Sequence, residues 1–211
     1  CGVIGFAGTT ARISALCGIG LSRAHWRSNY IQHMNKGGMK SCFKNPDRVE
    51  FSPVVSVDGM CLFVSRKVWQ EVRFDEKTFP NFHLYDLDFT TAVFRAGYIN
   101  YICNTVIVEH FSEGYYTQEW LAATIDFNNK WRDALPLYVS GFPCIKNLDR
   151  YVRSREFRFI KAMMKSRGKC SWELIDGLCR QYYRKYPFYR SIVVWFHAYR
   201  YRKRWKREGR L

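Results

Sequence analysis

The part of the chain that decides its fold is residues 82–98, which read FHLYDLDFTTAVFRAGY. Apolar residues over 84–96 recur close to the 3.6-residue period of an amphipathic helix, and Gly97 stands where a helix commonly ends. Asp86 and Asp88 fall near the start of this helix, where the helix dipole stabilises carboxylates. The segment therefore predicts a helix with two acidic side chains beside its N-terminus.

The segments around this helix predict a layered α/β protein, because strand-like and helix-like runs alternate along the chain. Residues 14–48 lack a clear period, and we expect an irregular loop with short helical pieces there. A turn is expected at 8–10, and Pro136 is expected to end the last helix of this part. We predict strands over 2–7, 54–57, 60–64 and 101–110, and helices over 66–72 and 116–135.

The composition is that of a globular protein, with 47% apolar and 18% aromatic residues in 211. We expect no membrane-spanning helix, because no run of about 18 uninterrupted apolar residues occurs. The chain starts at Cys1 without a secretory signal, so we expect either a processed protein or a fragment. Its eight cysteines are scattered without a C-x-x-C pair. This favours reduced thiols in the cytoplasm, with a disulfide framework as the alternative.

The charge is concentrated in the last third of the chain. Residues 149–211 contain 19 Lys or Arg and 5 Asp or Glu, a net charge of +14, out of +16 for the whole chain. Their apolar residues indicate three helices, broken near Gly168 and Pro187. Aromatic and basic residues alternate there, a pattern that suits an anionic membrane surface, nucleic-acid phosphates or a solvated basic face. We favour the membrane surface and expect no nucleic acid.

Asp86 is the strongest candidate for a catalytic residue in this sequence. A carboxylate at this position can accept the proton of an attacking hydroxyl, which is the task of a general base. The alternative is that Asp86 and Asp88 only stabilise the helix N-terminus. His83 lies next to the proposed base and can bind hydroxyl groups of a substrate, and Phe82 belongs to an aromatic cluster able to stack on a sugar ring, although such clusters are usually core.

The order of these motifs resembles the acceptor side of inverting GT-A glycosyltransferases of the family 2 type. The resemblance rests on Phe74-Asp75-Glu76, on the F-H-x-Y-D-x-D-F block that begins at Phe82, and on Arg95-Ala96-Gly97-Tyr98. It covers roughly residues 1–140 and looks most like a small bacterial branch of the family. Tyr85 replaces the usual glutamate, and Asp86 falls on the position of the catalytic base.

The resemblance implies further site residues. Asp58-Gly59 matches a glycine-led strand that leaves room for the sugar, although a glycine in a β-bulge explains the pair equally well. Tyr85 and Asp88 are implied as neighbours of the bound sugars. His110 matches a position where a histidine helps to hold a divalent cation, Mn²⁺ or Mg²⁺, on the nucleotide diphosphate; the alternative is a structural hydrogen bond.

The resemblance also implies an overall organisation. Residues 1–145 would form the acceptor-side part of a GT-A twisted sheet with flanking helices, and 146–211 a basic helical tail. The donor would be a nucleotide sugar such as a UDP-sugar, and the acceptor a glycan or lipid-linked glycan of a surface polysaccharide. The nucleotide-binding half of such enzymes is not found in these residues. The expected location is cytoplasmic, peripheral to the inner face of the cell membrane.

A different class of protein fits the same residues. A basic binding module, peripheral to a membrane or to nucleic acid, would need no catalysis, and its acidic block would only cap a helix. Sugar transfer and this binding module are the two hypotheses that the sequence leaves.

Overall fold

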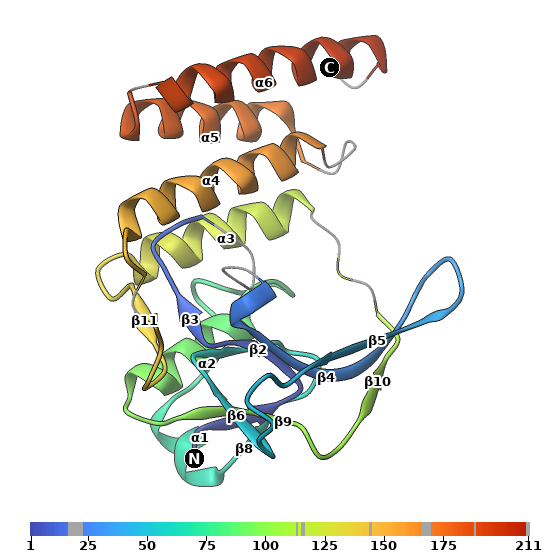
Figure 1. The fold of residues 1–211 in the computed structure, drawn as a ribbon, viewed down its shortest axis with the longest axis vertical. Helices are drawn as coiled ribbons and strands as arrows, with labels where there is room; N and C mark the ends of the chain where they lie inside the picture. The colour runs from blue at the N-terminus through green and yellow to red at the C-terminus, as the bar shows by residue number, and fades with distance from the viewer. Residues whose placement is uncertain are drawn as a thin grey trace. The chain divides into compact units, whose positions relative to one another are not determined.

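The structure is a computed structural model that describes residues 1–16, 23–112, 114, 117–143, 145–165, 170–187 and 189–209. Over these residues the chain is mixed α/β, with six α-helices and three β-sheets (Figure 1). It divides into two compact units. Unit 1 comprises Cys1–Ser14, Gly18–Gly114 and Asp126–Cys144, and unit 2 comprises Ala15–Cys17, Tyr115–Ile125 and Ile145–Leu211.

The first sheet of unit 1 has four strands in the order β6-β9-β1-β8. Strand β1 lies parallel to β9, with Ile4 opposite Tyr101, and antiparallel to β8. Strand β6 is antiparallel to β9. The strand bounds are β1 Val3–Gly5, β6 Phe51–Val54, β8 Phe63–Val64 and β9 Asn100–Cys103.

The second sheet has the order β10-β4-β2-β7, with β5 paired to β4. Strand β10 runs parallel to β4, and the other pairs are antiparallel. A two-stranded sheet joins β3 to β11. The bounds are β2 Ala7–Thr9, β3 Ala11–Arg12, β4 Trp26–His33, β5 Met39–Lys44, β7 Ser56–Val57, β10 Val108–His110 and β11 Leu137–Tyr138.

The prediction of an irregular loop over 14–48 was wrong. After a short 3₁₀ helix at Arg23–His25, strands β4 and β5 form a long antiparallel hairpin (Figure 1). The apolar alternation that identifies a strand is missing because two buried positions of β4 are polar, Ser28 and Asn29. The amide of Asn29 donates to the carbonyl oxygen of Val106 at 2.8 Å, so its burial is compensated. Residues 17–22 of this segment lie outside the described residues.

Further strand predictions needed correction. The strand expected over 54–57 is interrupted at Val55, between β6 and β7, and the strand expected over 60–64 is reduced to β8. The expected turn at 8–10 is in part strand β2, because the chain bends at Phe6 and passes from the first sheet into the second. The strand expected over 101–110 is divided into β9 and β10, which belong to different sheets. Val106 and Ile107 between them are exposed, so the apolar run that suggested one buried strand is a connection.

The helices of unit 1 follow the sequence pattern. Helix α1 spans Arg66–Glu71, with the Ser65 hydroxyl accepting the N–H of Val68, and α2 spans Tyr85–Arg95. Gly97 has φ +92°, the left-handed conformation expected after a helix. Helix α3, Gln118–Trp131, contributes residues to both units and ends before Pro136. The helices predicted over 66–72, 84–96 and 116–135 are thereby confirmed, with shorter bounds.

Threonine hydroxyls attach α2 to strand β7. Thr90 Oγ1 accepts the N–H of Val57 at 3.0 Å and donates to the carbonyl oxygen of Asp86 at 2.8 Å. The hydroxyls of Ser56 and Thr91 lie 2.9 Å apart, and Ser56, Val57, Thr90 and Thr91 are all fully buried. These directional bonds fix the position of the helix start along β7 more closely than apolar packing alone, because they require particular distances.

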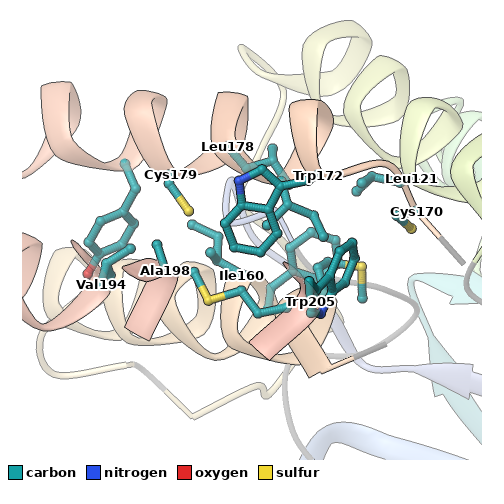
Figure 2. Packing of buried hydrophobic residues seen from close by; sticks show 14 residues of the cluster. Leu121, Ile160, Cys170, Trp172, Leu178, Cys179, Val194, Ala198 and Trp205 are labelled. Carbon is teal, nitrogen blue, oxygen red and sulfur yellow. The ribbon is translucent and has the colours of Figure 1, made fainter. Parts of the chain in front are cut away.

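Unit 2 has a core of its own, formed by helices α4 Leu148–Lys165, α5 Trp172–Lys185 and α6 Tyr189–Arg207. The three helices predicted after residue 148 are confirmed, although Gly168 lies outside the described residues. Figure 2 shows the buried side chains that pack between them, with Trp172 and Trp205 edge to face at 5.3 Å. Lys185 reaches the buried Glu156 at 2.7 Å and ties α5 to α4. Within the described residues, no helix has the length and apolarity needed to cross a membrane.

Candidate functional site

The N-terminus of α2 carries the carboxylate predicted to be the base. Leu84 precedes the helix in the left-handed conformation, at φ 63°, and is buried. This sharp turn brings Asp86, in the first turn of the helix, against the chain segment that follows β7. There the backbone N–H of Gly59 donates to Asp86 Oδ2 at 2.6 Å.

Gly59 is required for this approach. A Cβ atom built on Gly59 would lie 2.7 Å from the Cβ and 2.9 Å from the Oδ2 of Asp86, closer than such atoms pack. The two segments meet with backbone against side chain, which leaves no volume for a methyl group. The contacts give this glycine a third explanation, besides room for a sugar and a β-bulge: close approach to a carboxylate of the same chain.

Asp58 is a second carboxyl beside Asp86. Burial, together with the negative charge of Asp86, raises the pKa of Asp58 from 3.8 to about 7, and the N–H of Met60 opposes this rise. That N–H lies 3.3 Å from Asp58 Oδ1. The protonation of Asp58 is therefore coupled to the charge of Asp86, and Asp58 takes up its proton at a much higher pH than an ordinary aspartate.

Asp86 is the member of the pair that ionises first. Burial raises the pKa of Asp86, but the backbone N–H groups of Leu87, Gly59 and Asp86 itself and the charge of Arg12 oppose this rise. Asp58 receives only one such donor. Since donors and a cation stabilise the charged form, the negative charge resides on Asp86 and the proton on Asp58.

Arg12 and two tyrosines complete the surroundings of the pair. Arg12 is buried on β3, with its guanidinium 4.3 Å from the centroid of the Phe127 ring. Burial and the charges of Asp86 and Asp58 raise the pKa of Tyr85, and burial, Cys42 and Asp58 raise the pKa of Tyr30. Both phenols therefore stay protonated at neutral pH.

Asp88 points to different partners. It is buried, its Oδ2 accepts from Lys130 Nζ at 2.8 Å, and its Oδ1 accepts from the indole N–H of Trp131 at 2.8 Å. Lys130 also reaches Asp75 at 2.8 Å. The carboxylate of Asp88 thus joins α2 to α3 within unit 1, and these contacts support a structural role for Asp88. The structure does not bring Asp88 together with Asp58 and Asp86.

His110 ends β10, as the sequence indicated, and its ring is half-buried. Its Nδ1 lies 3.0 Å from Gln32 Oε1, and its ring meets the ring of Tyr30 edge to face at 6.1 Å. Burial lowers the pKa of His110, so the ring is neutral at pH 7. The described part of the chain brings no three His, Cys, Asp or Glu side chains together as metal ligands.

Phe82 and His83 lie just before α2. Phe82 is 78% exposed, and its ring centroid lies 6.2 Å from that of Tyr85 and 5.8 Å from that of His83. The other aromatics of the predicted cluster are Trp69, Phe74 and Phe79. Trp69 and Phe74 are partly buried and pack around the buried Phe89, and Phe79 is buried. Phe82 is thus the member of the cluster that offers an open ring face.

Comparison of the chain with protein-family models, with curated proteins and with solved structures found no match. The interpretation of the site accordingly rests on its own residues and geometry.

Sequence reasoning missed Arg12 and Tyr30. A signal for Arg12 was present, because it is the one charged residue in an otherwise apolar or small run, 2–16. A buried arginine in such a strand usually faces a carboxylate. Tyr30 had no such signal, since its strand was not recognised.

Proposed function

We propose that this chain carries the acceptor side of an inverting glycosyltransferase with a GT-A type of fold, and that Asp86 is its general base. The observation that carries the proposal is the pair of carboxyls at Asp58 and Asp86, one held charged by backbone N–H groups and one with a pKa near 7. Environments that separate two carboxyls in this way are typical of acid–base sites.

The reaction would proceed by direct displacement. The acceptor hydroxyl oxygen forms a bond to the anomeric carbon of the donor sugar while the bond from that carbon to the nucleotide diphosphate breaks. The hydroxyl proton passes to the carboxylate of Asp86. Asp58, still protonated, donates a hydrogen bond to a sugar hydroxyl, and Phe82 supplies a ring face for stacking.

The resemblance supports the substrate class, and the carboxyl pair and Phe82 are the residues proposed to contact the acceptor. A UDP-sugar as donor and a glycan or lipid-linked glycan as acceptor are part of the proposal. A divalent cation would neutralise the leaving diphosphate when bound. Among the described residues, His110 has no further His, Cys, Asp or Glu side chains grouped with it as ligands for such a cation.

Exchange of the Asp86 carboxylate for an amide tests the proposal. Asp86→Asn keeps an oxygen that accepts the Gly59 N–H but cannot take up the acceptor proton. We expect sugar transfer to fall by about 10² to 10⁴, with little change in thermal unfolding. The assay measures transfer of radiolabelled sugar from a panel of UDP-sugars by the full-length protein.

Asp75→Asn is the matched control, because Asp75 is also an aspartate of unit 1 but contacts Lys130 and lies outside the carboxyl pair. It should retain transfer within about threefold, the range of an exposed structural contact. Near-normal transfer by Asp86→Asn would contradict the proposal and favour the basic binding module.

A further inference from the structure

Helix α6 has two opposite faces, and its packing in unit 2 fixes which one is outward. Val194, Ala198 and Trp205 are buried against the other helices of the unit (Figure 2). The positions on the opposite side recur at helical spacing and are all exposed: Ile192, Trp195, Phe196, Tyr199, Lys203, Lys206 and Arg207. We call this set the outer face of α6.

The outer face begins apolar and ends cationic. Ile192, Trp195 and Tyr199 are 64%, 58% and 56% exposed, and the rings of Trp195 and Tyr199 stack at 5.9 Å. The last two turns carry the cations. Over its whole length α6 contains seven Lys or Arg and no Asp or Glu.

We propose that the outer face of α6 docks the protein on an anionic phospholipid surface. Tryptophan and tyrosine favour the headgroup zone of a bilayer, an isoleucine beside them reaches the acyl boundary, and cations on the same side meet the lipid phosphates. The inference goes beyond the proposed sugar transfer and does not depend on it.

The exposed apolar side chains favour α6 over the other two helices for this role. Within the described residues of α4, α5 and α6, the exposed large apolar side chains lie on α6. A second copy of the chain is a poor occupant, because two such faces would bring like charges together. Nucleic acid would use the aromatic rings and the cations but leave Ile192 without an apolar environment.

Vesicle co-sedimentation of the full chain tests the proposal. We compare vesicles of phosphatidylcholine with vesicles that contain 30% phosphatidylserine, at two salt concentrations. Binding should require the anionic lipid and weaken as salt rises, because screening shortens the range of the attraction. Equal binding to neutral vesicles at both salt concentrations would show that anionic lipid is not required. It would overturn the proposal that an anionic phospholipid surface binds the outer face of α6.

Two double charge-reversal variants, which change the net charge of the protein by the same amount, show which surface binds the vesicles. Lys203→Glu with Lys206→Glu should weaken binding at least about 25-fold, about fivefold for each cation lost. Lys36→Glu with Lys40→Glu, on the exposed β4–β5 hairpin, has the same net charge and should change binding less than about threefold. Equal losses in the two pairs would show attraction to the whole protein and overturn the assignment to α6.

An aromatic variant tests insertion. Trp195→Ala with Phe196→Ala should weaken binding at least tenfold and leave the helix content unchanged, since both side chains are exposed. Sedimentation of the protein without lipid measures whether it forms a dimer. Competition with single-stranded RNA measures whether RNA displaces the protein from vesicles. A dimer that this variant abolishes, or RNA that displaces the protein from vesicles at equal salt, would identify another occupant and contradict the proposal.

Discussion

Asp58 and Asp86 show how two identical side chains acquire different acid–base properties a few residues from a helix start. Asp86 receives several backbone N–H groups and the field of Arg12, while Asp58 receives one N–H and faces the charge of Asp86. A difference in donors of this kind separates the two protonation events. At the scale of the residue, the site is therefore defined by where the backbone N–H groups point.

Asp58 predicts a pH dependence of stability. Its folded pKa is about 7 against 3.8 for an ordinary aspartate, so the folded state keeps a proton that the unfolded state has lost. Stability therefore falls as the pH rises from about 4 to about 7 and is constant above. Asp58→Asn removes this loss, and its unfolding free energy relative to wild type should rise by about 3 kcal/mol between pH 5 and pH 8. Urea unfolding at both pH values measures it, and equal differences at both would show that Asp58 is ionised in the folded state.

A substitution at Gly59 is predicted to displace the Asp86 carboxylate of the Asp58–Asp86 pair. In Gly59→Ala the new methyl group would meet the Asp86 carboxylate, so either the N–H bond or the helix start must shift. We expect transfer to fall about 10²-fold and stability to fall by about 1 to 3 kcal/mol.

Gly177→Ala supplies the control, because a Cβ there has no neighbouring atom within 4 Å in the middle of α5. It should raise stability by about 0.5 to 1 kcal/mol, the helix propensity difference, without changing transfer. Normal transfer by Gly59→Ala would show that the close contact is not needed for activity.

At the scale of elements, α2 is joined to α3 through a buried charge. Asp88 is 1% exposed and depends on Lys130 and Trp131 for its hydrogen bonds. Removing one partner of a buried ion pair leaves a charge without compensation, which costs far more than the pair contributes. This contact explains an acidic residue in the first turn of α2 that the proposed chemistry does not use.

Lys130→Met is predicted to cost about 3 kcal/mol in unfolding free energy at pH 8. Burial already raises the pKa of Asp88, and loss of the lysine raises it further. The variant should accordingly recover stability as the pH falls and Asp88 takes up a proton in the folded state. Denaturation at pH 8 and pH 5 measures the difference. A cost that does not change with pH would show that lost packing, not the charge of Asp88, is responsible.

Sequence periodicity predicted the helices better than the strands, and the residues show why. Helix α2 has a regular apolar face and a glycine at its end, both visible in the sequence. Strand β4 buries Ser28 and Asn29, whose hydrogen bonds are made to segments far away in the chain. The same applies to the site: Asp86 and Gly59 were identified from local motifs, whereas Arg12 and Tyr30 reach it only through the pairing of strands.

At the scale of the whole molecule, the positive charge is concentrated in the same unit that has a separate apolar core. Residues 149–211 carry a net charge of +14, and they form most of unit 2, which has an apolar core of its own. The carboxyl pair, in contrast, lies entirely in unit 1. The proposed acid–base chemistry and the proposed attraction to anionic surfaces thus involve residues of different units, and substitutions can test one without altering the other.

Because the two units have separate apolar cores, we predict that a core substitution in one unit destabilises that unit and not the other. Trp205 is buried against Trp172, so Trp205→Ala should destabilise unit 2 by about 3 to 5 kcal/mol. Trp195→Ala is the matched control on the same helix, because Trp195 is 58% exposed and its loss should change stability by less than about 0.5 kcal/mol. Amide hydrogen exchange followed by peptide mass analysis distinguishes the units. In Trp205→Ala we expect faster exchange in α4, α5 and α6 and unchanged exchange in β1, β9 and α2. Equal acceleration in both sets would show that the chain unfolds as one cooperative body.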